Sequence, residues 1–493
     1  MQSGVQRIPM ERNMDCVERT EKGGRKVNRE KAGEVHSAGK TKGSKSYEID
    51  MCNGPLLGKI IFFAVPLMLS GILQLLFNAA DIVVVGQFVG SQALAAVGST
   101  GSLINLLINV FIGLSIGTNV LVAQYYGAKR EKDVSETIHT AILISLICGV
   151  ALIVIGISLS RQMLIWMGTP EDVLDQATLY MQIYFMGMPV MMLYNFGSAI
   201  LRAVGDTRRP LYFLFLAGIV NVILNLFFVI VLNMGVAGVA TATVISQVIS
   251  SLLVLRCLVK SEGCLHVHLK QLRIHKDKLL RMIRIGVPAG MQGAIFSISN
   301  VLIQASVNSF GSLTMAGNTA ASNIEGFVYN AMNAFHQTAL SFTSQNLGGG
   351  KPERIKKVAL MCQLLVMIVG IVMGYGAYFL GTQLLHIYSS DPQVVSFGLQ
   401  RMQIICTTYF FCGMMDTMVG VLRGLGYSIM PMMVSLIGSC LLRIVWIFTI
   451  FAWDSTLFVL YLSYPVSWVL TWAVHVICYF AVKKKWDRKP ASA

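Results

Sequence analysis

One carboxylate stands inside a long, mostly apolar run near the beginning of the chain. The stretch FNAADIVVVG covers residues 77–86, and Asp81 lies within a segment that extends from Ile60 to Val85. An ionisable side chain at membrane depth costs about 2.5–3.5 kcal/mol on insertion scales, so chains rarely keep one without an ion pathway, a partner or a cavity. Asp81 is therefore predicted to bind a cation. The structural alternative is a hydrogen-bond anchor for the nearby Asn78.

Two further acids, Glu325 and Asp416, occur in later apolar segments of the chain. A carboxylate there can supply the counter-charge for a bound cation in a medium of low dielectric constant. The competing explanation is an ion pair with Arg443, which would neutralise charge inside a helix bundle. The sequence leaves both explanations open.

The motifs that could indicate catalysis are weak. GLSIG (113–117) fits the G-x-S-x-G pattern of serine hydrolases, but no spacing singles out a histidine partner. The same letters read as Gly-x-x-x-Gly, a pattern for close helix packing, and we favour that reading. NLGGGKPE (346–353) lacks the P-loop frame, and the ten cysteines show no metal-ligand spacing. We therefore expect neither an enzyme nor a protein with a cofactor.

The composition is that of a membrane protein. Of 493 residues, 55% are hydrophobic and 13% are charged, against about 25% charged in ordinary soluble proteins. A membrane helix needs about 20 mostly apolar residues. Polar residues divide the chain into twelve such spans, near 58–86, 93–126, 135–160, 175–204, 210–232, 236–259, 284–310, 317–346, 357–381, 397–421, 431–453 and 456–482.

The basic residues orient these spans. If both termini lie inside, 36 of the 39 Lys and Arg fall on the inner side, and only Arg161, Arg401 and Arg443 do not. The positive-inside rule therefore predicts a multi-pass protein of the cell membrane with both termini cytoplasmic. The net charge of +15 then needs no nucleic-acid partner to explain it.

The chain also contains an internal repeat. LRAVGDTRRP (201–210) and LRGLGYSIMP (422–431) match at an offset of 221 residues. Further matches, at this offset or one residue more, are Gln124 and Gly127 with Gln345 and Gly348, Val65-Pro66 with Val287-Pro288, and Asn78 with Asn300. Two copies of a six-span unit enter the membrane from the same side, so they are parallel repeats that meet at a central cleft.

The repeat sets the expected domain boundaries. We expect a polar, disordered cytoplasmic tail over residues 1–54, an N-terminal six-helix lobe (N-lobe) over 55–262 and a basic linker over 263–283. A C-terminal six-helix lobe (C-lobe) over 284–482 and a basic tail over 483–493 complete the chain.

These stretches resemble the multidrug and toxic compound extrusion (MATE) transporters of the MOP superfamily. The resemblance covers roughly residues 55–482 and rests on VPLMLSGILQLLFNAADIVVVGQFVG (65–90), AQYYGAKR (123–130), LRAVGDTRRP, NVILNLFFVIVLNMGVAGVATATVISQ (221–247), SQNLGGGKPE (344–353), LRGLGYSIMP and LRIVWIFTIF (442–451). It implies an all-α membrane protein, with twelve transmembrane helices in two lobes, that exports organic compounds against inward flow of Na⁺ or H⁺.

The resemblance also assigns site residues. In one branch of the family an acid on the first span binds the coupling ion, and its position here is Asp81. The residues that accompany it fall on Asn221, Asn225, Thr243, Pro66 and Phe77. Asn225 replaces a second acid and Phe77 replaces a tyrosine. Because Asn221 and Asn225 stand one helical turn apart, they face the same way and could lend oxygens to a Na⁺ ion; the alternative is hydrogen bonding between helices.

The expected function is an antiporter for lipophilic organic cations, coupled to Na⁺ or H⁺, that acts as a monomer in the lipid bilayer. The alternative is a flippase for a lipid-linked precursor in the same superfamily. Candidates for the substrate or a second ion site are Asp416, Glu325, Asn78, Asn300 and Phe77.

Overall fold

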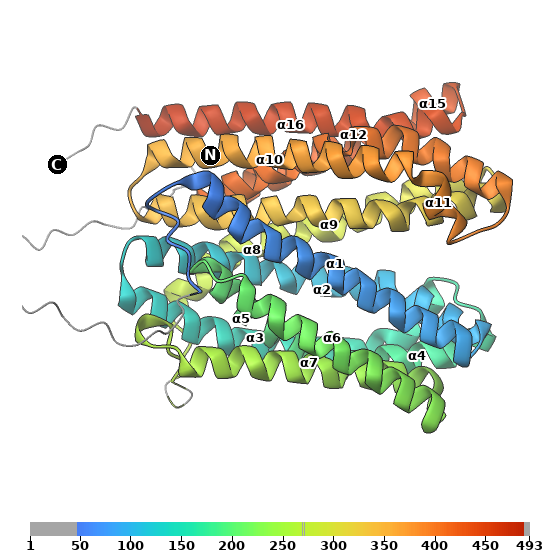
Figure 1. Cartoon of the computed structure of the whole chain (residues 1–493), viewed down its shortest axis with the longest axis horizontal. Coiled ribbons are helices and arrows are strands. Elements are labelled where there is room, and N and C mark those ends of the chain that lie inside the picture. Colours follow the sequence, from blue (N-terminus) through green and yellow to red (C-terminus); the bar gives the residue numbers. More distant parts are fainter. Residues whose placement is uncertain (1–46, 269, 271, 488–493) are drawn as a thin grey trace, which may run out of the picture. The chain divides into compact units, whose positions relative to one another are not determined.

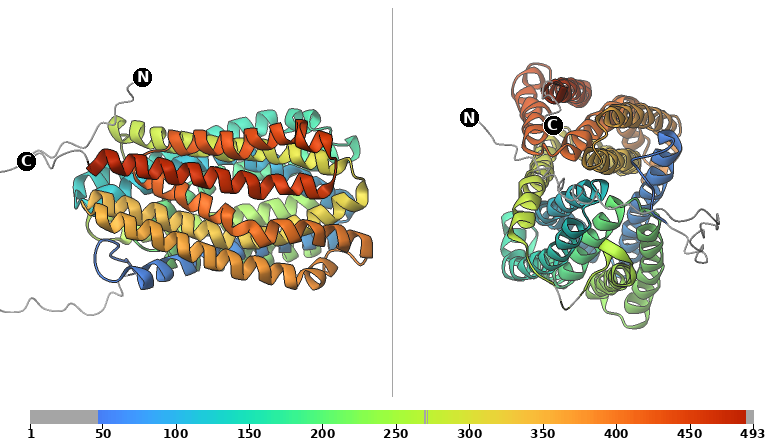
Figure 2. Two further views of the ribbon diagram at one scale, coloured as in Figure 1. Left: turned by 90° about the horizontal axis from the view of Figure 1, so that it is seen from above. Right: turned by 90° about the vertical axis from the view of Figure 1, so that its left-hand side faces the viewer.

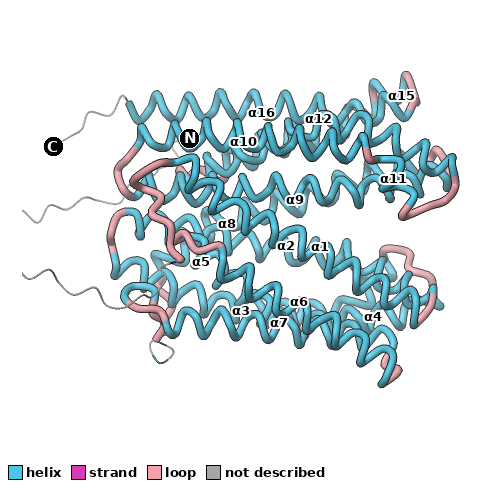
Figure 3. The backbone as a smooth tube through the Cα atoms, viewed as in Figure 1, coloured by secondary structure: helices cyan, strands magenta, loops and turns pink. Residues whose placement is uncertain are grey.

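The computed structural model describes residues 47–268, 270 and 272–487, whose regular elements are all helical (Figures 1 and 3). The first half contains α1 (Leu56–Phe88), α2 (Ser91–Gly127), α3 (Glu131–Trp166), α4 (Glu171–Met186), α5 (Met188–Ala203), α6 (Arg208–Leu226), η1 (Phe227–Val231), α7 (Gly235–Lys260) and η2 (Gly263–Leu265). The second half contains α8 (Lys276–Asn308), α9 (Ser312–Gly348), α10 (Pro352–Phe379), α11 (Gly381–His386), α12 (Pro392–Gly424), α13 (Ile429–Ser435), η4 (Leu436–Leu441), α14 (Leu442–Phe448), α15 (Ile450–Trp453) and α16 (Leu457–Asp487).

Each of the twelve predicted spans coincides with a helix or a run of helices. Within the described residues, ten helices are long and apolar enough to cross a membrane, and an eleventh span is added if α4 and α5 count as one. These two helices are bent by 49° at Gly187, and Pro189 is the second residue of α5. Proline has no N–H to donate to the preceding turn, which accounts for the break.

The remaining predicted span, 317–346, lies in α9, which is long enough at 37 residues but is not among the apolar helices. It carries many buried polar side chains, among them Asn318, Glu325, His336 and Gln345. These face the helices around it, since α9 packs against α1, α2, α10 and α12. A central helix that touches little lipid does not need an apolar surface, which explains its composition.

Two helices pass from one lobe to the other (Figures 1 and 2). The first part of α1, including Ile60 and Phe63, is buried in a cluster with residues of α9, α10 and α12, and α1 also packs against α6. Its repeat partner α8 packs along α2, and Ile303 and Val307 at its other end join a cluster with α12 and α16. Helices α1 and α8 are therefore related by the repeat, and each packs against helices of both lobes.

The lobes touch at the end of the bundle that carries the Lys- and Arg-containing loops, here called the basic end. Gln124 donates a hydrogen bond from Nε2 to the carbonyl of Gly424 at 3.1 Å. In the reciprocal contact, Gln345 donates to the carbonyl of Ala203 at 2.6 Å. The repeat offset of 221 relates Gln124 to Gln345 and Ala203 to Gly424. The two hydrogen bonds are therefore equivalent, which explains why the glutamine recurs in both copies of the repeat.

Residues 47–54 lie across the basic end and contact both lobes, so this part of the stretch expected to be a disordered tail is ordered. The ring of Tyr47 lies 5.1 Å from the guanidinium of Arg209, and Glu48 accepts a hydrogen bond from Tyr126 of α2 at 2.9 Å. On the C-lobe, backbone carbonyls of this segment accept from Asn346, Lys351 and Arg354. The remainder of the predicted tail, residues 1–46, lies outside the described residues, as do residues 488–493.

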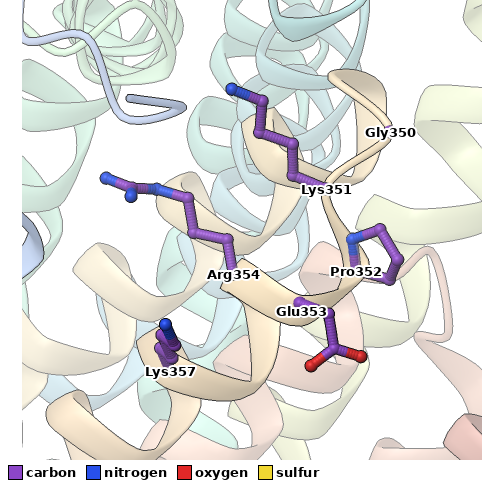
Figure 4. Close-up of a pocket in the computed structure, with 6 residues that line it drawn as sticks. All are labelled: Gly350, Lys351, Pro352, Glu353, Arg354 and Lys357. Atoms are coloured by element: carbon purple, nitrogen blue, oxygen red, sulfur yellow. The ribbon is translucent and has the colours of Figure 1, made fainter. Parts of the chain in front are cut away.

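A pocket at the same end is lined by basic residues of the α9–α10 turn (Figure 4). Lys351, Arg354 and Lys357 point away from the carboxylate of Glu353. Since Lys351 and Arg354 already hold the carbonyls of Cys52, Asn53 and Gly54, we interpret this pocket as part of the packing of residues 47–54. Helix α8 begins at Lys276, within the stretch expected to be linker.

Candidate cation site and charged clusters

The structure brings Asp81 together with three residues from two other helices. Asn225 of α6 donates a hydrogen bond from Nδ2 to Asp81, and Thr243 of α7 donates from Oγ1 to the second carboxylate oxygen at 3.4 Å. Asn221 donates to Thr243 at 3.4 Å and accepts from Asn225 at 3.3 Å. The hydrogen bonds seen at the carboxylate come from Asn225 and Thr243, and Asn78 itself is exposed.

This cluster has the chemistry of a small-cation site. Asp81 is 9% exposed, and among the described residues no Lys or Arg forms an ion pair with it. The buried Oδ1 atom of Asn225 has no hydrogen-bond partner. A buried carboxylate without a positive partner is costly, and carboxylate, carbonyl and hydroxyl oxygens suit hard cations. The residues present therefore fit a proton or a Na⁺ ion.

A small pocket opens directly beside this cluster. It is lined by Tyr184, Gly187, Met191, Thr243, Val244 and Gln247. Thr243 belongs both to the pocket and to the Asp81 hydrogen bonds. The bend between α4 and α5 lies at Gly187, which lines this pocket. The break between the two helices therefore forms one wall of the pocket beside Asp81.

The other predicted N-lobe residues, Pro66, Phe77 and Asn78, lie on α1. Pro66 lies inside α1 and is buried, and its carbonyl accepts a hydrogen bond from Ser70 at 2.8 Å. The ring of Phe77 packs so closely on Gly218 of α6 that no side chain would fit there. Asn78 and its repeat partner Asn300 are both exposed on their helices.

Glu325 is paired, but with a different arginine from the one expected. Its carboxylate accepts two hydrogen bonds from Arg401, at 2.9 and 2.7 Å. The same guanidinium donates to Asn318 at 2.7 Å, and both members of the pair are buried. The expectation of a pair with Arg443 is therefore wrong. Sequence reasoning missed Arg401, although an arginine inside an apolar span was a usable signal.

Asp416 is partly buried and has a tyrosine partner. Its side chain hydrogen-bonds Tyr329 of α9, and Arg423 lies within electrostatic reach. Its backbone carbonyl accepts from Nδ1 of His336 at 2.6 Å. Arg423 donates in turn to Gln292 at 2.7 Å. Among the described residues Asp416 forms no direct ion pair, so it remains the C-lobe acid best able to meet a bound cation.

The GLSIG motif serves packing. A side chain added at Gly113 or Gly117 of α2 would collide with the backbone of α8 at Gly290 or Met282. The hydroxyl of Ser115 donates to the carbonyl of Ile112 in its own helix at 2.7 Å. No nucleophile is presented here, and two helices of different lobes meet closely.

Comparison with known proteins identifies this architecture. Residues 66–227 and 288–449 match the MatE family model separately. The chain belongs to the MatE family. The two matches fall on the two copies of the repeat, so this MatE protein carries one family unit in each lobe.

Relatives of this MatE protein are named as transporters. It is 29% identical over 383 residues to "Probable multidrug resistance protein YoeA" of Bacillus subtilis (strain 168), covering 76% of this chain and 82% of that protein. It is 24% identical over 384 residues to "Probable multidrug resistance protein NorM" of Thermotoga maritima, covering 77% and 82%. A solved structure described as the outward-facing conformation of a multidrug resistance MATE family transporter superposes with a TM-score of 0.82 at 20% identity, covering 90% of this chain and 99% of that one.

Proposed function

We propose that this MatE protein is a secondary antiporter that exports organic, mainly cationic, compounds across the cell membrane in exchange for Na⁺ or H⁺. The observation that carries the proposal is Asp81, a buried acid that is held by Asn225 and Thr243 and has no ion pair with a Lys or Arg of the described residues. Such a group binds a cation when water is excluded. The names of the relatives support the export of drugs.

Coupling needs two conformations with different affinities for ion and substrate, because a ligand that binds both equally shifts nothing. The contacts of Gln124 and Gln345 hold the lobes together at the basic end. The positive-inside rule makes that end cytoplasmic. On this assignment the conformation is closed to the cytoplasm, and cation binding at Asp81 would bias the return to the opposite state.

The flippase alternative rests on arginines in the C-lobe, since a lipid-linked phosphate requires cationic groups. Two of the three buried arginines are occupied, Arg401 by Glu325 and Arg423 by Gln292. Nε of Arg423 and Nη2 of Arg443 are buried without a hydrogen-bond partner. We favour the antiporter because Asp81 offers a buried acid for the coupling cation.

The test is dye export from proteoliposomes under an imposed Na⁺ or H⁺ gradient, with a cationic rhodamine ester as substrate. Uphill export driven by at least one gradient supports the antiporter. Movement of a fluorescent lipid-linked phosphate between leaflets, without dye export, would support the flippase instead.

A further inference from the structure

Arg443 is a buried cation that the proposed function does not use. It lies on α14 and is 3% exposed. Its Nε donates to Oγ of Ser467 on α16 at 2.8 Å, but Nη2 is buried without a hydrogen-bond partner. Among the described residues no carboxylate forms an ion pair with it. A buried charge without an ion pair is costly unless a bound group of opposite charge compensates it.

The surroundings of Arg443 are aromatic. Its guanidinium carbon lies 4.3 Å from the ring centre of Tyr464 and 5.6 Å from that of Trp468. Trp468 stacks on Tyr409 at 5.2 Å, and Tyr409 stacks on Tyr329 at 6.4 Å. Cation–π contacts offset part of the burial cost, but they satisfy no N–H group.

The place of Arg443 in the fold is the repeat equivalent of the Asp81 site. In the N-lobe α6 packs between α1 and α7, and in the C-lobe the run α13–α14 packs on α8 and α16 in the same way. An offset of 222 residues, which aligns Pro66 with Pro288, places Ile303 opposite Asp81. Ile303 is buried in the apolar cluster that contains Trp468. The C-lobe thus has an apolar residue where the N-lobe has its acid.

Both equivalent spans also contain a π-helical turn beside the polar residue. The turn η1 begins two residues after Asn225, and η4 ends two residues before Arg443. Such turns are frequent at functional sites because they reorient the side chains next to them. The turn follows the carboxamide in the N-lobe and precedes the guanidinium in the C-lobe, so it adjoins the polar residue in both spans.

We infer that Arg443 binds a carboxylate carried by the organic substrate, with the substrate's aromatic ring against the face formed by Tyr329, Tyr409 and Trp468. A guanidinium matches a carboxylate through two parallel N–H donors. Tyr329 is exposed and Tyr464 is half-buried. The substrate's aromatic ring can therefore approach along Tyr329, and its carboxylate reaches Arg443 when the Tyr464 side chain moves aside. This inference rests on the proposed function and extends its substrates to compounds that carry both charges.

The test uses two probes that differ in one group, a rhodamine with a free benzoate and its methyl ester. Purified full-length protein is titrated with each dye by fluorescence anisotropy. Arg443→Gln should weaken binding of the free acid by at least about tenfold, which is the loss expected for one charged hydrogen bond. Its affinity for the ester should stay within about twofold, and Arg443→Lys should lie between.

Two further variants keep the test decisive. Ser467→Ala removes the hydrogen bond that orients the guanidinium, and should selectively weaken the free acid by about threefold, even if Arg443→Gln does not fold. Arg161→Gln, at an exposed ion pair with Asp175, should change neither affinity. Equal losses for both dyes, or no loss for either in the Arg443 and Ser467 variants, would overturn the inference. Failure of the wild type to export either dye under any gradient would instead remove the proposed function.

Discussion

Asp81 and Arg443 lie in equivalent groups of three helices in the two lobes, but the side chains that contact them differ. The acid is held by two polar side chains from α6 and α7, whereas the arginine has one hydroxyl partner and aromatic faces. The repeat therefore conserves helix packing while the polar residues in it have diverged. Duplicating a fold fixes where a cavity lies, and individual side chains then decide which charge it accepts.

The largest effect is expected from Asp81→Asn, which keeps the shape and removes the charge. Gradient-driven export should be abolished, while the protein stays folded and still binds dye, because the coupling cation loses its charged ligand. Export from proteoliposomes under Na⁺ and H⁺ gradients measures this. Asp175→Asn, at an exposed acid of the same lobe, is the control and should export normally. Undiminished uphill export by Asp81→Asn would demote the acid to a structural anchor.

Glu325→Gln tests whether the second buried acid is structural. Because Arg401 would be left as an unpaired buried charge, unfolding free energy should fall by about 3–5 kcal/mol, measured by thermal unfolding in detergent. The double variant Glu325→Leu with Arg401→Met should recover most of that loss, since an apolar pair replaces an ion pair of similar volume. A stable Glu325→Gln protein with weakened dye binding would place Glu325 in the substrate site instead.

Asp416→Asn tests whether Asp416, unlike the ion-paired Glu325, binds the cationic substrate. Removal of this charge, which forms no direct ion pair among the described residues, should weaken binding of the cationic rhodamine ester by about tenfold or more. A neutral dye of similar size should lose much less affinity. Anisotropy titrations with both dyes decide the matter, and equal affinity of wild type and variant for the cation would exclude Asp416 from the binding role.

The smallest effect is expected at Asn221, whose described hydrogen bonds are to Thr243 and Asn225 and not to Asp81. Loss of a supporting side chain typically costs about tenfold or more in metal affinity, so Asn221→Ala should raise the Na⁺ concentration needed for half-maximal export by about that factor. Asn195→Ala, whose amide donates to the carbonyl of Met191 in its own helix, is the matched control. If Na⁺ drives no export while H⁺ does, the cluster carries a proton and this variant should alter only the dependence on H⁺.

The sequence by itself was enough to predict the twelve spans and the internal repeat, and it showed that Asp81 is an acid inside the first span. Hydrophobic length and the cost of charge in a membrane are local properties, and they can be read from consecutive residues. Family motifs then placed Asn221, Asn225 and Thr243 beside Asp81, and the structure brings these residues together. The same local signals could not show that α9 crosses the centre of the bundle, because its polar side chains are satisfied by distant helices.

Only the tertiary structure decided which charges meet. Glu325 and Arg401 are on α9 and α12 and lie 76 residues apart in the chain, and no spacing links them. The sequence suggested Arg443 for that acid, whereas packing places Arg443 among Tyr464, Ser467 and Trp468 of α16. Pairing between helices depends on their rotation and depth, which π-helical turns such as η4 change by a fraction of a turn. That information is not present in any one segment of the chain.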